Sequence, residues 1–220
     1  MYTPDGKRNT EIKKCIRITD KNLADYLGKV KYRPDKANKR PEVGVVRGLA
    51  WTSVGGDTLQ IEVNVMPGDG KLQMTGQMGD VMKESAQIAL TYVRSVADRY
   101  GVESRYFKEH DLHLHIPEGA VPKDGPSAGI TMATAMLSAV TGKKVCASVA
   151  MTGEITLRGR VLPIGGLKEK TLAARMAHMK KVLVPDKNRP DMAEISKEIT
   201  KGMEIVFVKT MDDVVREAFV

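Results

Sequence analysis

One serine and one lysine stand where each could take part in nucleophilic catalysis. Ser127 follows a stretch rich in proline and glycine, and the residues after it, AGITMATAM, predict a helix. Amides at a helix N-terminus are unpaired and partly positive, so they can stabilise an oxyanion that forms beside an attacking serine oxygen. The alternative is that Ser127 is only the N-cap of this helix, a position that serine commonly takes.

A lysine can act as the base for such a serine only if its amine is neutral. Because the reference pKa is about 10.4, a pKa near 7 requires about 4 to 5 kcal/mol of destabilisation of the ammonium form. The segment GGLKEKTLAARMAHM predicts a helix with two lysines, Lys168 and Lys170. Positions three, four and seven after Lys170 are all alanine, whereas those after Lys168 include Arg175. We therefore expect Lys170 to be buried and Lys168 to be solvated, the alternative for either being an ordinary surface cation.

The string GPSAG, residues 125–129, also matches the GxSxG pattern of α/β-hydrolases. That pattern places the serine directly after a buried strand, but VPKD precedes it here. A triad of that family also needs a histidine downstream, and His178 is the one histidine after Ser127. A Ser-His hydrolase that uses His178 is therefore the alternative enzyme.

The strings PKDGPSAG, MTGEITLRG and LPIGGLKEK follow one another in the sequence, with GLAWTSVGGD upstream. Together they resemble the peptidase domain of Lon proteases over about residues 45–220. The expected strands and helices intermix without strict βαβ alternation, which favours an α+β fold with mixed sheets and packed helices over a doubly wound one. The resemblance aligns Ser127 with the nucleophile and Lys170 with its partner. It also implies an endopeptidase that acts on unfolded or damaged proteins and assembles as a hexamer in the full-length protein.

Three further residues have supporting roles that rest on the same resemblance. Thr152 matches the threonine that supports the lysine, and a hydroxyl can do so without adding charge. Asp124 matches an aspartate that we assign to gating the loop. A carboxylate close to the lysine would favour the ammonium form, so a loop, capping or inhibitory role remains open for Asp124. Glu118 has the same ambiguity, and the alternative for Thr152 is a plain strand threonine.

The sequence predicts no metal or cofactor site in this chain. His113 and His115 lie on one face of an expected strand, but a third ligand at fixed spacing is missing. The string GDGKL lacks the Ser or Thr that ends a P-loop, so we expect no ATP site. ATP and Mg are implied only for the ATPase domain of a full-length Lon protein. Cys15 and Cys146 are far apart and in no CxxC motif, which favours a reducing compartment.

Composition indicates a soluble globular chain, with 42% hydrophobic and 28% charged residues. No run is long and apolar enough for a membrane span, and the start lacks the apolar core of a signal peptide. We expect a location in the bacterial cytoplasm, with the mitochondrial matrix as the alternative. Twelve Lys and Arg against six Asp and Glu give residues 1–42 a charge of +6, out of +8 for the whole chain. Weak nucleic-acid contact through this head, or a nucleic-acid-binding module, is the alternative to a solvated linker.

Residues 1–42 are predicted to be a basic head and linker, a remnant of the small helical domain of an AAA+ ATPase, and residues 43–220 the peptidase domain. From Val45 the alternating pattern around GGD and GDG predicts antiparallel strands and hairpins. Helices are expected from near Asp20, over 79–100, 127–140, 166–179 and 190–200, and at the C-terminus; strands are expected over 112–116, 149–153, 160–163, 181–185 and 204–208.

Overall fold

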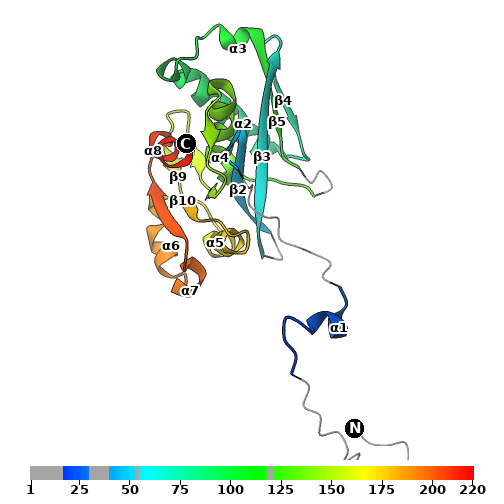
Figure 1. Ribbon diagram of the computed structural model, residues 1–220. Coiled ribbons are helices and arrows are strands. Elements are labelled where there is room, and N and C mark those ends of the chain that lie inside the picture. Colours follow the sequence, from blue (N-terminus) through cyan, green and yellow to red (C-terminus); the bar gives the residue numbers. More distant parts are fainter. Residues whose placement is uncertain (1–16, 30–39, 53–54, 118–120) are drawn as a thin grey trace, which may run out of the picture. The chain divides into compact units, whose positions relative to one another are not determined.

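Two units make up the chain, Met1–Pro34 and Asp35–Val220. The computed structural model describes residues 17–29, 40–52, 55–117 and 121–220 (Figure 1). The described residues of the first unit form one short helix, α1 (Leu23–Leu27), with Asn22 at its N-cap. The sequence predicts this helix from near Asp20, and the structure begins it slightly later. The division at residue 42 and the origin of the head stay predictions.

A seven-stranded sheet forms the middle of the second unit, as far as the structure describes it. β3 pairs antiparallel with both β2 and β5, whereas the pairs β11–β10, β10–β7, β7–β2 and β5–β4 are parallel. This mixed sheet with its packed helices confirms the predicted α+β fold. In spatial order the strands are β11 (Glu204–Val208), β10 (Lys181–Pro185), β7 (Val149–Met151), β2 (Val45–Thr52), β3 (Gly55–Pro67), β5 (His110–His115) and β4 (Leu72–Thr75).

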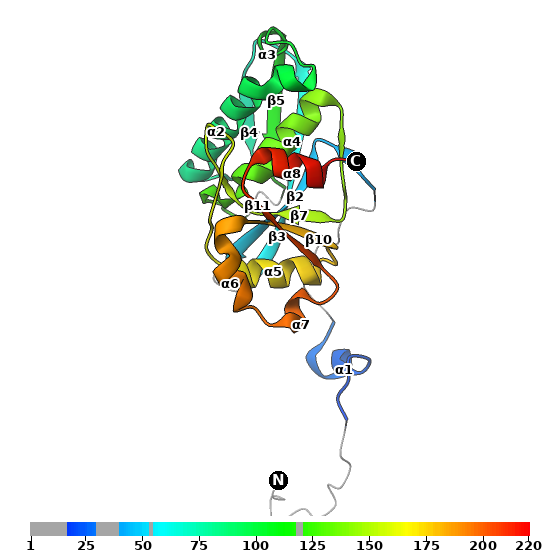
Figure 2. The same cartoon turned by 90° about the vertical axis from the view of Figure 1, so that its left-hand side faces the viewer.

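One face of the sheet is covered by α2 (Asp80–Val96) and α4 (Gly129–Thr141), with α8 (Met211–Ala218) beside α4 (Figure 2). Side chains from strands and helices form one apolar cluster here, including Ile61 and Leu114 from the sheet. α4 is buried along most of its length because the sheet lies on one side of it and helices lie on the other. This helix therefore gives the residues just before it a rigid support.

The opposite face carries α5 (Leu167–Met176), with α6 (Arg189–Ala193) and α7 (Lys197–Thr200) beside it. A second apolar cluster joins α5 to β2, β7 and β10. Gly56 in β3 lies so close to α5 that a Cβ there would overlap the Glu169 carbonyl. The glycine pair of GLAWTSVGGD thus includes a residue that lets α5 approach the sheet.

The predicted helix 79–100 is confirmed as α2 continued by a 3-10 turn, Ala97–Tyr100, which ends at the left-handed Gly101. The helical stretch expected over 190–200 is two short helices, α6 and α7. The remaining short elements are α3 (Tyr106–Glu109), the 3-10 turns Pro126–Ala128 and Asp186–Asn188, and the paired strands β1 (Glu42–Val43) with β6 (Lys144–Val145) and β8 (Glu154–Ile155) with β9 (Val161–Leu162). No helix within residues 17–29, 40–52, 55–117 and 121–220 is both long and apolar enough to cross a bilayer.

The hairpin expected around Gly-Asp-Gly, residues 68–70, is wrong. β4 does not return beside β3 but pairs with β5 in parallel. The carboxylate of Asp111 accepts hydrogen bonds from the amides of Asp69 (2.9 Å) and Lys71 (2.8 Å), which holds this loop against the start of β5. These bonds lower the pKa of the Asp111 carboxyl, and the bond from the Lys71 amide contributes most. Because this contact spans about forty residues, the local pattern did not indicate it.

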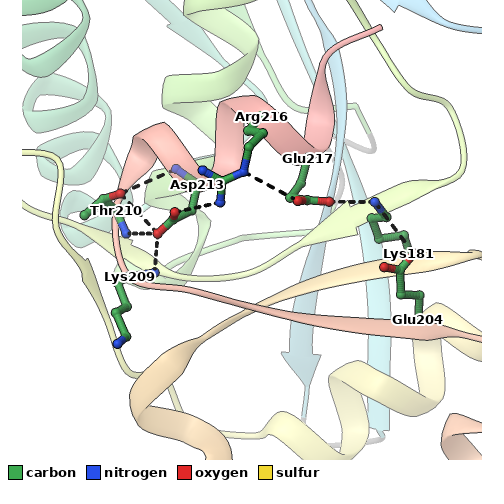
Figure 3. A network of polar contacts seen from close by, with 7 residues as sticks. All are labelled: Lys181, Glu204, Lys209, Thr210, Asp213, Arg216 and Glu217. Carbon is green, nitrogen blue, oxygen red and sulfur yellow. Dashed lines mark hydrogen bonds and ion pairs between the residues drawn. The ribbon is translucent and has the colours of Figure 1, made fainter.

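Polar contacts join α8 to the edge of the sheet (Figure 3). Lys181 of β10 forms ion pairs with Glu217 of α8 (2.7 Å) and Glu204 of β11 (3.6 Å). At the other end of α8, Thr210 and Asp213 form a capping box, each side chain accepting a hydrogen bond from the other's amide. These contacts orient the last helix on the sheet.

Candidate active site

Ser127 lies in the 3-10 turn Pro126–Ala128, directly before α4. Its carbonyl oxygen accepts hydrogen bonds from the Gly153 amide (2.8 Å) and the Thr152 hydroxyl (3.2 Å). In return the Ile130 amide donates to the Gly153 carbonyl (3.1 Å). The segment between β7 and β8 therefore holds the backbone at Ser127 and at Ile130 in the following helix, while the half-buried side chain of Ser127 lines a cavity.

Lys170 approaches Ser127 from α5, which lies on the face of the sheet opposite to α4. It lies in the second turn of α5, its side chain is almost completely buried, and its Nζ is 3.0 Å from Ser127 Oγ. The alanine face predicted from the sequence, Ala173, Ala174 and Ala177, is buried against the sheet, whereas Lys168 is exposed. The distinction between the two lysines is therefore confirmed.

The surroundings of Lys170 weaken its hold on the proton. Burial lowers the pKa of this amine to about 8, because an ammonium ion loses solvation in an apolar setting. Within the described residues Lys170 forms no ion pair, and its side chain hydrogen-bonds to the neutral hydroxyl of Ser127. A hydrogen-bonded serine beside an amine with such a pKa is the arrangement of a nucleophile and its general base.

A cavity of about 620 Å³ opens over this pair. That volume is within the usual range of a small-molecule pocket. Apolar side chains from β2, β3 and α2 form much of its wall, among them Leu49, Leu59 and Met82. Charged groups also line it, namely Asp57, Lys123, Asp124, Glu154 and Lys170. The wall is therefore largely apolar, with charged groups at several positions.

Thr152 is fully buried beside the pair. Its hydroxyl donates to the Ser127 carbonyl, and its amide donates to the Leu183 carbonyl of β10 (3.1 Å). The resemblance implies support of the lysine, but in this structure the Thr152 hydroxyl hydrogen-bonds to the serine backbone. Direct support of Lys170 by Thr152 stays a prediction.

Asp124, one of the two acidic residues singled out from the sequence, anchors the loop before Ser127 through backbone hydrogen bonds. The Asp124 carboxylate accepts hydrogen bonds from the amides of Met82 (2.9 Å) and Gly125 (2.8 Å). In the described part of the chain it forms no ion pair with Lys170, so the inhibitory pairing considered above is not formed here. Glu118 lies outside the described residues, and its role stays a prediction.

The start of α4 offers fewer unpaired amides than the sequence suggests. The Gly129 amide donates to the Pro126 carbonyl, and the Ile130 amide donates to Gly153. Both are therefore engaged, and neither is available for an oxyanion in this structure. The predicted oxyanion donors must come from the turn before Gly129 or from a rearranged turn.

The alternative base, His178, is exposed and follows the end of α5 in a left-handed conformation. It is not among the residues that line the cavity. Ser127 also differs from the serine of a nucleophile elbow, because β5 ends at His115, well before the turn Pro126–Ala128 begins. The structure therefore favours Lys170 over His178 as the partner of Ser127.

The remaining histidines follow the expected strand pattern. His113 and His115 point to the same face of β5, and a nitrogen of each ring lies within 3 Å of Thr75 Oγ1, at 2.9 Å and 2.7 Å. Among the residues that the structure describes, no three His, Cys, Asp or Glu side chains gather into a possible metal site. Cys146 is a free thiol, and Cys15 lies outside the described ranges.

Sequence reasoning assigned no site role to Trp51, Met82 or Lys123, which all line the cavity. Trp51 and Lys123 belong to strings that carry the family resemblance, so that signal was present. Met82 lies on the buried side of α2, where an apolar residue is expected in any case, and no local signal separates it from the core.

Comparison with known proteins identifies the group to which the chain is similar. Residues 17–220 match the family described as Lon protease (S16) C-terminal proteolytic domain. The Lon protease of Lachnoclostridium phytofermentans is 66% identical over 205 residues, which cover 93% of this chain and 25% of that protein. Lon protease 1 of Bacillus subtilis is 53% identical over 210 residues, covering 96% of this chain and 27% of that protein. Lon protease 1 of Thermus thermophilus is 54% identical over 202 residues, covering 91% and 25%.

This chain therefore spans about a quarter of the length of these relatives. The comparisons favour a protease over a GxSxG hydrolase, and they give no support to a nucleic-acid-binding module. The family match, over residues 17–220, contains the strings on which the resemblance rests. The chain belongs to the family of Lon protease C-terminal proteolytic domains.

Proposed function

We propose that the chain is the proteolytic part of an ATP-dependent endopeptidase that hydrolyses peptide bonds of unfolded or damaged proteins. Ser127 is the nucleophile and Lys170 the general base. The observation that carries this proposal is the 3.0 Å contact between Lys170 Nζ and Ser127 Oγ, inside a cavity where burial lowers the lysine pKa to about 8. At that pKa about a tenth of the amine is neutral at pH 7.

Acylation follows from this geometry. The neutral amine of Lys170 accepts the hydroxyl proton of Ser127 while Oγ forms a bond to the carbonyl carbon of the substrate. The resulting ammonium donates that proton to the leaving nitrogen as the peptide C–N bond breaks. An ester on Ser127 and a free amine remain.

Deacylation uses the same groups with water in place of the serine hydroxyl. Lys170 accepts a proton from the water, whose oxygen attacks the ester carbonyl, and the proton returns to Ser127 Oγ as the ester bond breaks. Amides of the turn before Gly129 stabilise the oxyanion in both steps. The chemistry needs no cofactor, because the nucleophile and the base are both side chains.

Supporting roles fall to residues that hold the pair in place. Thr152 acts through its hydrogen bond to the Ser127 carbonyl. Glu118 keeps the supporting role that the family resemblance implies.

Properties of a longer protein are proposed from the resemblance and the relatives. Since the chain spans a quarter of their length, ATP and Mg use by a separate ATPase domain, assembly as a hexamer, and a location in the bacterial cytoplasm belong to this proposal. Unfolded polypeptides are the proposed substrates because the cavity wall is largely apolar and unfolded chains expose apolar side chains.

The test uses an unfolded protein and a small fluorogenic peptide as substrates. Cleavage should be lost in Ser127→Ala and in Lys170→Ala, with circular dichroism unchanged, and should remain largely intact in His178→Ala. Near-normal cleavage by Lys170→Ala together with loss in His178→Ala would replace the dyad by a Ser-His pair.

A second experiment tests whether peptide cleavage by this chain is independent of the proposed ATPase domain. Peptide cleavage by this chain should not respond to ATP with magnesium, and a stably folded protein should not be degraded. ATP-stimulated degradation by the pure chain would contradict this.

A further inference from the structure

The first turn of α2 is capped by a residue from elsewhere in the chain. Its own N-cap residue is Gly79, which has no side chain to offer. The amide of Met82, the third residue of the helix, instead donates to Asp124 Oδ1 at 2.9 Å. A side-chain oxygen on this amide is what an N-cap residue normally supplies, and a negative charge suits a helix N-terminus.

Backbone hydrogen bonds join the same two segments. The Gly79 amide donates to the Lys123 carbonyl (2.7 Å), and the Lys123 amide donates to the Gln77 carbonyl (3.0 Å). One turn further along α2, the Ser85 hydroxyl donates to the Pro126 carbonyl (3.4 Å). The first turns of α2 therefore hydrogen-bond to Lys123, Asp124 and Pro126, which lie just before Ser127 in the sequence.

Asp124 is at the centre of this junction. The oxygen that caps α2 also accepts the Gly125 amide at 2.8 Å, so one carboxylate fixes both the helix and its own loop. Gly125 has a φ of 117°, a conformation that favours glycine, and this turn directs the chain into Pro126–Ala128.

Gly79 makes the close approach possible. A Cβ at this position would lie 2.5 Å from Asp124 Oδ2 and 2.8 Å from Asp124 Cβ. The φ of Gly79 is −71°, which any residue can adopt. An alanine here would therefore act through contact with Asp124 and not through backbone strain.

We propose that Asp124 is a positioning residue: it caps α2 from the nucleophile loop and thereby holds Ser127 within reach of Lys170. The inference rests on the proposed function, since it assigns a role within the Ser127–Lys170 site. This role differs from an ion pair with Lys170. The Asp124 oxygen acts as a hydrogen-bond acceptor for the start of α2, and its negative charge does not act on the lysine.

The experiment compares Asp124→Asn, Asp124→Ala and Gly79→Ala. Asparagine keeps an oxygen acceptor and is itself a good capping residue, so kcat should stay within about threefold of the wild type. Alanine at 124 removes the acceptor, and kcat should fall about tenfold with KM nearly unchanged. Gly79→Ala should reproduce that loss, and the double variant should add little to it.

The matched control is Asp213→Ala, which removes the N3 carboxylate of the α8 capping box (Figure 3), a residue that does not line the cavity. It should lower the melting temperature while leaving kcat unchanged. This separates loss of a helix cap in general from loss of the cap that adjoins Ser127.

The pH profile of kcat/KM decides between positioning and charge pairing. Under the proposal the ascending limb keeps its midpoint in every folded variant. A shift of that limb to lower pH in Asp124→Asn would show that the charge acts on Lys170 and would overturn the proposal. If Asp124→Ala does not fold, the midpoint and kcat of Asp124→Asn still decide.

Higher activity in Asp124→Ala would also overturn it, because an inhibitory partner would explain that result. Full-rate cleavage in Asp124→Ala that is still abolished by Ser127→Ala would contradict the positioning role while leaving the proposed function intact. Cleavage that survives Ser127→Ala would contradict the proposed function itself.

Discussion

Lys170 and Lys181 are both partly or wholly withdrawn from water, yet their surroundings have opposite effects on the proton that each holds. Lys170 is buried beside a neutral hydroxyl, and burial lowers its pKa to about 8. Lys181, on β10, hydrogen-bonds to Glu217 and lies near Glu204, and these carboxylates raise its pKa (Figure 3). One is a candidate base and the other a permanent cation.

The difference shows what a lysine needs in order to act as a base. Removal from water destabilises the ammonium ion, but a carboxylate at hydrogen-bond distance more than restores it. The cavity has acidic residues, Asp57 and Glu154 among them, and neither forms an ion pair with Lys170 in the described chain. The catalytic setting is therefore defined as much by the groups kept away from Lys170 as by Ser127.

The largest expected effect is on the pH dependence of activity. With a base of pKa about 8, kcat/KM for a fluorogenic peptide should rise about 50-fold between pH 6 and pH 8 and level off above pH 9. Lys181→Met should leave the midpoint in place, because Lys181 remains charged across this range. A profile already flat from pH 6 would indicate a histidine or another base.

Removing the Thr152 hydroxyl should have an effect of comparable size. Thr152→Val keeps the shape of the side chain but loses the hydrogen bond to the Ser127 carbonyl, so kcat should fall by about 10- to 100-fold with little change in KM. The control is Thr134→Val in α4, which also removes a buried hydroxyl but leaves the Ser127 carbonyl untouched. An equal loss of kcat in both variants would mean that any buried hydroxyl near α4 has this effect.

Stability should respond to Lys170 in the direction opposite to activity. The folded-state pKa lies below the unfolded value of about 10.4, so at pH 7 the buried ammonium costs the folded state up to about 3 kcal/mol. Lys170→Met should therefore raise the free energy of unfolding at pH 7, and the gain should fade as the pH rises from about 8 towards 10.5. Urea unfolding at pH 7 and pH 10 measures this; a loss of stability at pH 7 would contradict the burial cost.

Lys181→Met should show the smallest effect and the opposite sign. The folded-state pKa of Lys181 is raised, so its ion pairs stabilise the fold below the unfolded pKa and lose this contribution as the pH rises through the folded pKa. Because the network is partly solvated, the loss at pH 7 should be about 0.5 to 1 kcal/mol. If Lys170→Met and Lys181→Met both raised the free energy of unfolding at pH 7 by the same amount, the distinction between the two lysine environments would be contradicted.

Much of this contrast could be predicted from sequence where the signal is local. The alanines at helical spacing after Lys170 and the charge at the same spacing after Lys168 indicated which lysine is buried, and the structure agrees. The α+β class and most helices and strands follow from the same kind of periodicity.

Contacts between distant segments were not predictable in this way. The loop at residues 68–70 is held by Asp111, so the expected hairpin is absent. Asp124 caps a helix that begins 44 residues earlier, at Asp80. Thr152 donates a hydrogen bond to the carbonyl of Ser127, which is also distant in the sequence. Each depends on which strands become neighbours, and local spacing carries no information about that.

A direct titration of the two lysines by NMR tests the central claim without reference to turnover. With lysine ¹³C-labelled at Cε, and signals assigned through Lys170→Met and Lys181→Met, both amines can be followed in one series of spectra. The account predicts a Lys170 midpoint near pH 8 and a Lys181 amine still protonated at pH 10. A Lys170 midpoint above pH 10 would contradict its role as the base of Ser127.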